Sequence, residues 1–145
     1  MAIELEKLDP WTRSLIEDMR AHDGRPSASS GWAAGKPFIV LTTKGAKTGA
    51  DRVSITTYHK DGDRWVIAAS KGGSDDNPAW YHNLKSHPET TIEVDNREVR
   101  VRATEATGAE RDRLWNDHMA ELPEFREYPK KTNRVIPMFV LERID

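Results

Sequence analysis

The amino-acid sequence predicts an α+β fold, in which a mainly antiparallel sheet of about six strands is flanked by helices. Three observations lead to this prediction. Strand-like runs are joined by short Gly-, Asp- and Asn-containing turns, helical patterns lie mostly at the edges, and no strand–helix–strand alternation recurs. The missing alternation argues against a doubly wound nucleotide-binding sheet. The 145 residues make about one domain, and a sheet in so short a chain can close into a barrel.

The N-terminal segment 1–23 is predicted to form a helix. Asp9 suits the N-cap position and Pro10 the first helical position. Apolar residues then recur every fourth position, at Trp11, Leu15 and Met19. The following stretch, 24–35, is small, polar and turn-rich around Trp32, and we expect a mobile loop there that could act as a lid.

Residues 36–142 are predicted to hold the barrel and its helices within a single domain, 1–145. The expected strands lie at 38–43, 52–59, 65–69, 92–94, 99–103 and 136–141. Asp61-Gly62 and Asp95-Asn96 are typical of tight turns between paired strands.

Two further helices are expected among these strands. One begins at Asn77-Pro78 and ends near Ser86, because Pro88 follows. The other begins at Thr107, where Glu110 completes a capping-box pattern. Pro123 interrupts this second helix, and a short turn-rich segment leads to the last strand.

Composition narrows the class of protein. The chain has 22 Lys and Arg against 24 Asp and Glu, a net charge of −2, which argues against a nucleic-acid partner. It has no Cys, and its five His lack the spacing of metal ligands, so no metal is expected. Apolar runs stay well below the roughly 18 residues of a membrane span, and residues 1–7 lack a signal-peptide pattern. We therefore expect a cytoplasmic protein without an integral membrane segment, either a monomer or a homodimer.

Positive charge is concentrated in one region of the chain. Between Lys36 and Lys71 lie seven bases and three acids, although the whole chain is slightly acidic. The turn 44–49, Lys-Gly-Ala-Lys-Thr-Gly, combines cations with flexible backbone that could hold a phosphate or carboxylate. A solvated hairpin turn would show the same residues. The nucleotide-binding P-loop pattern fails, because Ala46 precedes Lys47 where that pattern requires Gly.

A second candidate site follows the strand 65–69. Glycines turn the chain after Ser70-Lys71, and a helix N-terminus with unpaired N–H groups comes next, which suits an anion or a polar ring. Trp80 and Asn83 lie three residues apart on one helix face and could flank a planar heterocycle. A Trp at this spacing from Leu84 is equally typical of a core residue.

Several segments of the chain, from about Lys36 to Glu142, resemble the deazaflavin (F420)-dependent nitroreductase family. They are 41–49 (LTTKGAKTG), 68–73 (AASKGG), 77–85 (NPAWYHNLK) with Pro88, 103–105 (ATE) with Glu110-Arg111 and Trp115, and 132–137 (TNRVIP). The resemblance implies a split β-barrel that binds coenzyme F420, a deazaflavin with a phosphate- and glutamate-containing tail. It also implies an F420H2-dependent reductase, which transfers a hydride to an electron-poor acceptor such as an enone or lactone alkene, a quinone or a nitro compound.

The same resemblance implies roles for individual residues. The cofactor tail and phosphate would be held by Lys47, Thr48 and Arg52. The deazaflavin ring and phosphate would be lined by Ala68, Ala69, Ser70, Lys71, Gly72 and Gly73, with Trp80 and Asn83 beside them. Ser70 is the expected catalytic hydrogen-bond donor, and Tyr128 a candidate proton source.

The chain departs from the family pattern chiefly on the substrate side. Ala46, Ile55 and Thr57 stand where an Arg, a Pro and an aromatic residue are usual. Leu122, Phe125 and Tyr128 occupy a C-terminal segment in which the nitroimidazole-activating member has several tyrosines. Two other functions stay open from the sequence: a non-catalytic deazaflavin carrier, and an FMN-dependent oxidoreductase on a similar barrel.

Overall fold

The computed structural model describes residues 4–144, so residues 1–3 of the predicted N-terminal segment and Asp145 lie outside it. The described chain forms seven strands, one more than predicted, in a single sheet. They are β1 (Phe38–Lys44), β2 (Asp51–Thr57), β3 (His59–Asp61), β4 (Arg64–Ala68), β5 (Glu89–Val94), β6 (Arg97–Ala106) and β7 (Met138–Arg143). The extra strand arises because the expected strand 52–59 is divided at Tyr58: β2 pairs with β1, whereas β3 pairs with β4.

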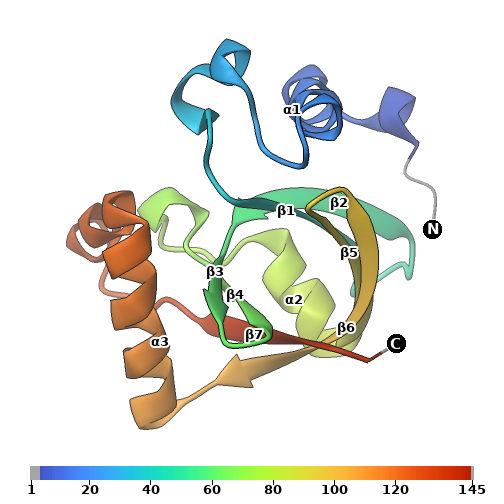
Figure 1. Ribbon diagram of the computed structural model, residues 1–145. Coiled ribbons are helices and arrows are strands. Elements are labelled where there is room, and N and C mark those ends of the chain that lie inside the picture. Colours follow the sequence, from blue (N-terminus) through green and yellow to red (C-terminus); the bar gives the residue numbers. More distant parts are fainter. Residues whose placement is uncertain (1–3, 145) are drawn as a thin grey trace.

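The strand order shows that the sheet is curled. The order is β2-β1-β5-β6-β7-β4-β3, and every neighbouring pair is antiparallel. β2 and β3 stand at opposite ends of this order, yet only Tyr58 separates them along the chain. The two ends must therefore come together, and Figure 1 shows the strands arranged as a ring. This confirms the predicted fold class.

The two expected hairpins are present. Asp95 and Asn96 connect β5 to β6 with φ values of 51° and 61°, as a type I′ turn requires. The β3–β4 turn consists of Gly62 and Asp63, one residue later than predicted, because Asp61 is itself paired with Arg64.

The helices are α1 (Pro10–Ala21), α2 (Ala79–Ser86) and α3 (Gly108–Glu121), with short 3-10 helices η1 (Leu5–Lys7), η2 (Ala28–Ala33), η3 (Lys71–Gly73) and η4 (Pro123–Lys130). The predicted cap of α1 is confirmed, since Asp9 accepts a hydrogen bond from the Thr12 amide at 3.0 Å. The capping box of α3 is wrong: Thr107 is the N-cap residue, but its side chain makes no capping hydrogen bond. None of the helices in residues 4–144 is long and apolar enough to cross a membrane.

The segment 24–35, predicted as a loop, contains η2 and is tied to α1. Asp18 accepts hydrogen bonds from the Ser27 amide at 2.7 Å and from the hydroxyls of Ser27 and Ser30 at 2.7 and 2.5 Å. The hydroxyl bonds from Ser30 and Ser27 lower the pKa of Asp18 to about 2. These bonds determine where Trp32 lies relative to α1.

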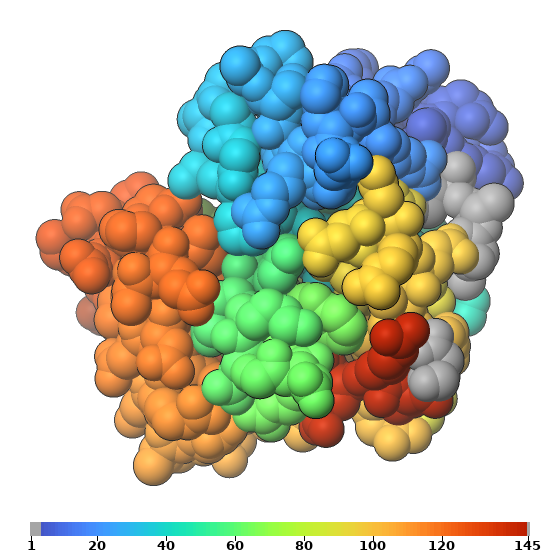
Figure 2. Space-filling view, viewed as in Figure 1, coloured from blue at the N-terminus to red at the C-terminus, as the bar shows by residue number. Residues whose placement is uncertain are grey.

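Three apolar clusters pack against the sheet, one inside the barrel and two outside it. The largest fills the barrel and includes Leu41, Ile67, Trp80 and Phe139. A second lies between α3, η4 and the outer side of β4 and β7, and a third lies between α1 and the outer side of β1 and β2. Figures 1 and 2 show the N-terminal segment and the α3–η4 segment covering different sides of the barrel.

Candidate active site

A cavity of about 830 Å³ lies between the barrel and the segments that cover it. Its two sides differ in origin. The barrel wall comes from β2, β4, η3 and the start of α2, and consists of Ser54, Thr56, Ala68, Ser70, Lys71, Gly72, Pro78, Ala79 and Trp80. The aromatic wall comes from α1, η2, the start of β1 and η4, and consists of Trp11, Trp32, Lys36, Phe38, Glu124, Phe125 and Tyr128. Ile55 and Thr57 complete the lining.

The barrel wall contains a backbone turn suited to an anion. Ser70 has right-handed helical dihedral angles, and Lys71 follows with φ = 47°. Successive residues of opposite hand turn their N–H groups towards one point, which makes a concavity that binds negatively charged oxygens. The Lys71 side chain adds a positive charge beside this turn. The turn at Ser70 and Lys71, called the anion cradle below, therefore has the geometry to hold an anion, and the sequence had singled it out as a candidate site.

Arg134 holds this turn in place. Its guanidinium donates hydrogen bonds to the carbonyl oxygens of Ala69 and Ser70, both at 3.0 Å, and to that of Ser74 at 2.8 Å. It also donates to Oδ1 of Asn77 at 2.5 Å. A planar group with five N–H donors can satisfy several carbonyls at once. The sequence analysis assigned no role to Arg134. The signal that could have drawn attention to it is that it lies in segment 132–137, which resembles the family pattern.

The N-terminus of α2 also faces the cavity. Pro78 is the N-cap without a side-chain cap, and Pro78, Ala79 and Trp80 all line the cavity. The first turn of a helix presents unpaired N–H groups and a partial positive charge. Trp80 is 6% exposed and packs edge-on against Phe139 at 6.0 Å, so it is both a core residue and part of the wall.

Asn83 lies outside the cavity lining, although the sequence placed it beside Trp80. Its Oδ1 accepts a hydrogen bond from the Ala46 amide at 2.9 Å, and its Nδ2 donates to Oγ1 of Thr43 at 3.0 Å. Asn83 therefore connects α2 to the β1–β2 turn. In the structure its side chain positions this turn.

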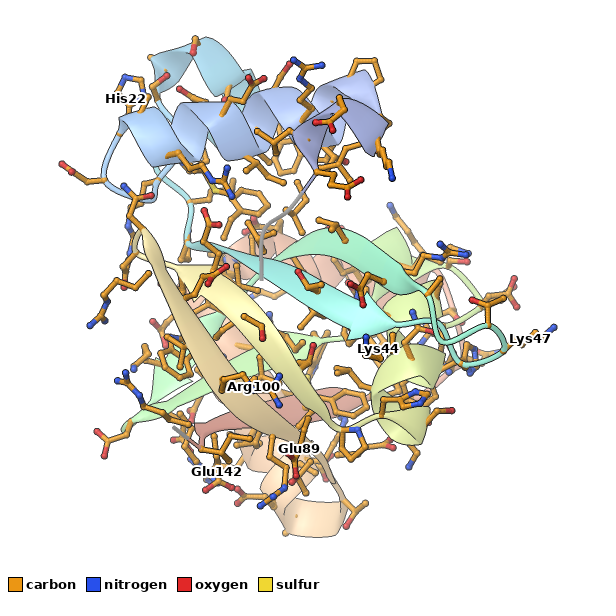
Figure 3. All side chains as sticks on the ribbon, turned by 90° about the vertical axis from the view of Figure 1, so that its right-hand side faces the viewer. His22, Lys44, Lys47, Glu89, Arg100 and Glu142 are labelled. Atoms are coloured by element: carbon orange, nitrogen blue, oxygen red, sulfur yellow. The ribbon has the colours of Figure 1, made fainter. Side chains whose placement is uncertain are left out.

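Lys47 and Thr48 belong to that turn and Arg52 to the start of β2, and none of the three lines the cavity. Figure 3 shows Lys47 at the tip of the turn, directed away from the barrel. Arg52 is opposite Thr43 and lies on the same face of β2 as Ser54 and Thr56, which do line the cavity. A ligand that leaves the cavity along β2 would meet Arg52 first.

Two other predicted residues, Ala69 and Gly73, do not line the cavity. Ala69 is fully buried and its amide is bonded to the Pro137 carbonyl at 2.9 Å. Gly73, with φ = 85°, packs against η4: a Cβ atom there would lie 3.2 Å from Cα of Tyr128. Gly73 thus allows η4 to approach η3 closely.

The aromatic wall contains two exposed indoles. Trp11 and Trp32 stack with ring centroids 6.3 Å apart and 11° between their planes, yet they are 51% and 65% exposed. Trp11 was predicted on the apolar stripe of α1 and instead faces this cavity, while Leu15 and Met19 enter the core. Phe125 and Tyr128 pack edge-on at 4.9 Å, and Leu122 is buried.

Tyr128 keeps its proton at neutral pH. Burial raises the pKa of its phenol, and the nearby Glu124 carboxylate raises it further. A protonated phenol at the cavity surface can donate a hydrogen bond. Among residues 4–144, no group of three or more His, Asp or Glu side chains is arranged to hold a metal ion.

Comparison with known proteins shows which family this chain belongs to. The family model described as F420H(2)-dependent quinone reductase matches residues 11–143. An F420H(2)-dependent quinone reductase of Mycobacterium tuberculosis (strain H37Rv) is 36% identical over 138 residues, covering 88% of this chain and 91% of that protein.

Two solved structures are similar over much of the chain. An F420H2-dependent reductase is 33% identical with a TM-score of 0.67, and the match covers 73% of this chain and 94% of that one. A protein described as a domain-swapped dimer is 28% identical with a TM-score of 0.69, covering 91% of this chain and 97% of that one. The first of these shows that the curled sheet is a split barrel.

Proposed function

Because this chain belongs to the F420H2-dependent quinone reductase family, we propose that it reduces a quinone with coenzyme F420 as its cofactor. The observation that carries the proposal is the cavity with two unlike walls. One wall offers the anion cradle beside the apolar side chains of Ala68 and Trp80, and the other offers exposed aromatic rings. A negatively charged, planar cofactor and a planar apolar acceptor need such a pair of walls.

The residues of the barrel wall fit the cofactor. The backbone turn at Ser70 and Lys71, the Lys71 side chain and the N-terminus of α2 all favour a phosphate. Trp80 and Ala68 supply an apolar surface for a ring. The cavity volume of about 830 Å³ lies within the usual range for small-molecule sites.

The tail of the cofactor would extend along β2 towards the β1–β2 turn. Arg52 lies on the strand face that leads out of the cavity, and Lys47 and Thr48 lie at the turn itself. Asn83 holds the backbone of this turn at Ala46, so the cations are attached to a fixed element. They would bind the carboxylates of the tail.

When bound, reduced F420 supplies a hydride to the acceptor. The protein positions the two reactants and excludes water. Ser70 lines the cavity with 8% exposure, so its hydroxyl can donate a hydrogen bond to the ring or to the acceptor. Tyr128 can donate a second hydrogen bond from the aromatic wall.

The aromatic wall favours a flat acceptor. Trp11 and Trp32 are already stacked, and both present ring surface to the cavity. Aromatic rings stack on planar conjugated molecules, and the family description names quinones. Enones, lactones and nitro compounds are less extended examples of the same electron-poor class.

The decisive experiment combines binding with turnover. Purified protein is titrated with oxidised F420 by fluorescence quenching, and oxidation of F420H2 is then followed with menadione, an enone and a nitroaromatic compound. Saturable binding and fastest turnover with menadione are expected. Binding without acceptor-dependent oxidation would indicate a carrier, and purified protein with bound flavin and no response to F420 would indicate an FMN-dependent enzyme.

A further inference from the structure

One ion pair lies in the aromatic wall of the cavity. Nζ of Lys36 is 2.5 Å from Oε2 of Glu124, and the two residues are 88 positions apart in the sequence. Lys36 precedes β1, whereas Glu124 belongs to η4. Their side chains are 29% and 34% exposed, so the pair is partly withdrawn from solvent. It links the two segments that carry the wall.

The charged residues that line the cavity are Lys36, Lys71 and Glu124, among the residues that the structure describes. Lys71 belongs to the anion cradle of the barrel wall. Lys36 is therefore the cation on the acceptor side, and Phe38, Phe125 and Tyr128 line the same wall. Burial alone would raise the pKa of Glu124, but the hydrogen bond and charge of Lys36 and a backbone hydrogen bond together outweigh it and lower the pKa. The carboxylate is thus ionised and holds the ammonium in place.

We propose that Lys36 binds the oxygen of the reduced acceptor and gives it a proton, with Glu124 as its positioning residue. The inference rests on the proposed function. Lys36 touches the substrate in this proposal and is a catalytic residue, while Glu124 acts through it.

Reduction of a quinone to a hydroquinone needs a group that supplies a proton to the oxygen. Hydride transfer adds one hydrogen nucleus and two electrons, and the quinone becomes a hydroquinone anion with its charge on one oxygen. An N–H bond of the Lys36 ammonium then breaks, an O–H bond forms, and neutral hydroquinone results. The neutral amine takes a proton from water. In water, alkyl ammonium groups and phenols are acids of similar strength, so proton transfer from the first to the anion of the second is chemically reasonable.

The ammonium also stabilises the charge before the proton moves. A cation within hydrogen-bond distance of a developing oxyanion favours the transition state over the neutral quinone. Tyr128 lies in the same wall, but its neutral phenol carries no positive charge with which to stabilise the oxyanion. Lys36 is therefore assigned as the donor.

The test uses the full chain with F420H2 and menadione. Lys36→Met should lower kcat about 100-fold, the size expected for loss of a general acid, while the Kd for F420 stays within twofold. Turnover of this variant should also rise as the pH falls, because protons from water replace the missing donor. Lys36→Arg should keep the ion pair and the wild-type melting temperature, but not the wild-type kcat, because guanidinium retains its proton.

Two further measurements separate catalysis from a purely structural link. Ethylammonium in the buffer should restore part of the kcat of Lys36→Ala, and Glu124→Gln should lower kcat less than Lys36→Met does. The proposal is overturned if Lys36→Met retains kcat within twofold of wild type, or if Tyr128→Phe loses turnover while Lys36→Met does not. If wild-type protein fails to bind F420, the proposed function itself is wrong, and this result is distinct from either of those.

Discussion

The two walls of the cavity are built in opposite ways. The barrel wall is held by backbone hydrogen bonds and by Arg134, and Ala68, Ser70 and Trp80 in it are at most 8% exposed. The aromatic wall is carried by segments outside the barrel, and its two indoles are more than half exposed. A fixed wall suits one constant cofactor, whereas a wall of exposed rings suits flat acceptors of varying outline. The comparison predicts that changes in the barrel wall alter cofactor binding and changes in the aromatic wall alter acceptor kinetics.

The largest effect is expected at Arg134. Arg134→Ala removes these donors from the carbonyls of Ala69, Ser70 and Ser74; Ser70 keeps the Gly73 amide, and each buried carbonyl left without a donor costs about 1–3 kcal/mol. We expect the free energy of unfolding to fall by about 3 kcal/mol and the Kd for F420 to rise at least about 100-fold. Chemical denaturation and fluorescence titration measure the two quantities.

A matched control is Arg102→Ala, which removes an exposed arginine paired with Glu89 on β5. It should change neither quantity appreciably, because exposed ion pairs contribute little. Wild-type affinity in folded Arg134→Ala would show that the cradle does not depend on this residue.

The next effect concerns the cofactor tail. The double variant Lys47→Ala/Arg52→Ala should raise the Kd for F420 about 30-fold, because two charge-assisted contacts are lost, while its melting temperature stays near wild type. The double variant Lys60→Ala/Arg97→Ala removes the same charge from β3 and the start of β6, away from the β1–β2 turn. An equal rise in both double variants would mean that net charge, not the β1–β2 turn, governs binding.

A smaller effect is expected from the aromatic wall. Trp32→Ala should raise the KM for menadione about 3- to 10-fold, the loss expected for one stacking contact, without changing the Kd for F420. Val135→Ala is the control, since Val135 is 71% exposed and lies outside the cavity lining. A change in F420 affinity instead of KM would contradict the division of roles between the walls.

The smallest expected effect is on the pH dependence of stability, and it comes from a buried histidine pair that packs against η4. Nδ1 of His59 lies 2.7 Å from Nδ1 of His118, and both Nε2 atoms are buried without a hydrogen-bond partner. The His118 ring also packs edge-on against Phe125 at 4.5 Å. Burial lowers the pKa of both imidazoles, that of His118 to about 3, so the folded protein holds them neutral.

The sign of the pH dependence follows from these shifts. Unfolded histidine takes up a proton near pH 6.5, whereas folded His118 does so only near pH 3, so stability is nearly constant well above pH 6.5 and falls as the pH drops through that value. Between pH 7 and 6 the loss is below about 1 kcal/mol per histidine, and the slope approaches about 1.4 kcal/mol per pH unit at lower pH. Urea unfolding at several pH values measures this, and the slope should diminish in the double variant His59→Phe/His118→Leu.

Much of the barrel could be predicted because its signals are local. Asp95-Asn96 specifies its turn through the backbone angles of those two residues, and Asp9 caps α1 through a residue three positions away. The Ser70–Gly73 turn was identified from glycines and a following helix start. The division at Tyr58 was missed, because a continuous strand-like run does not reveal that its two halves pair with different partners.

The partners of single side chains were not predictable in the same way. Arg134 reaches Ser70 across 64 positions, and Lys36 reaches Glu124 across 88. Trp11 carried the same helical signal as Leu15 but faces the cavity instead of the core. Periodicity shows which residues share a helix face, and it does not show what that face will meet.

From its residues alone, the chain determined most of its strands, the Asp95-Asn96 turn, the turn at Ser70–Gly73 and its resemblance to deazaflavin reductases. The tertiary structure decided that Arg134 supports the cradle, that Asn83 supports the β1–β2 turn, and that Lys36 and Glu124 join the two segments of the aromatic wall. The physical reason is the distance along the sequence over which each interaction acts. Backbone angles and short-range hydrogen bonds depend on near neighbours in the sequence, whereas these contacts exist only after the curled sheet and its covering segments have come together.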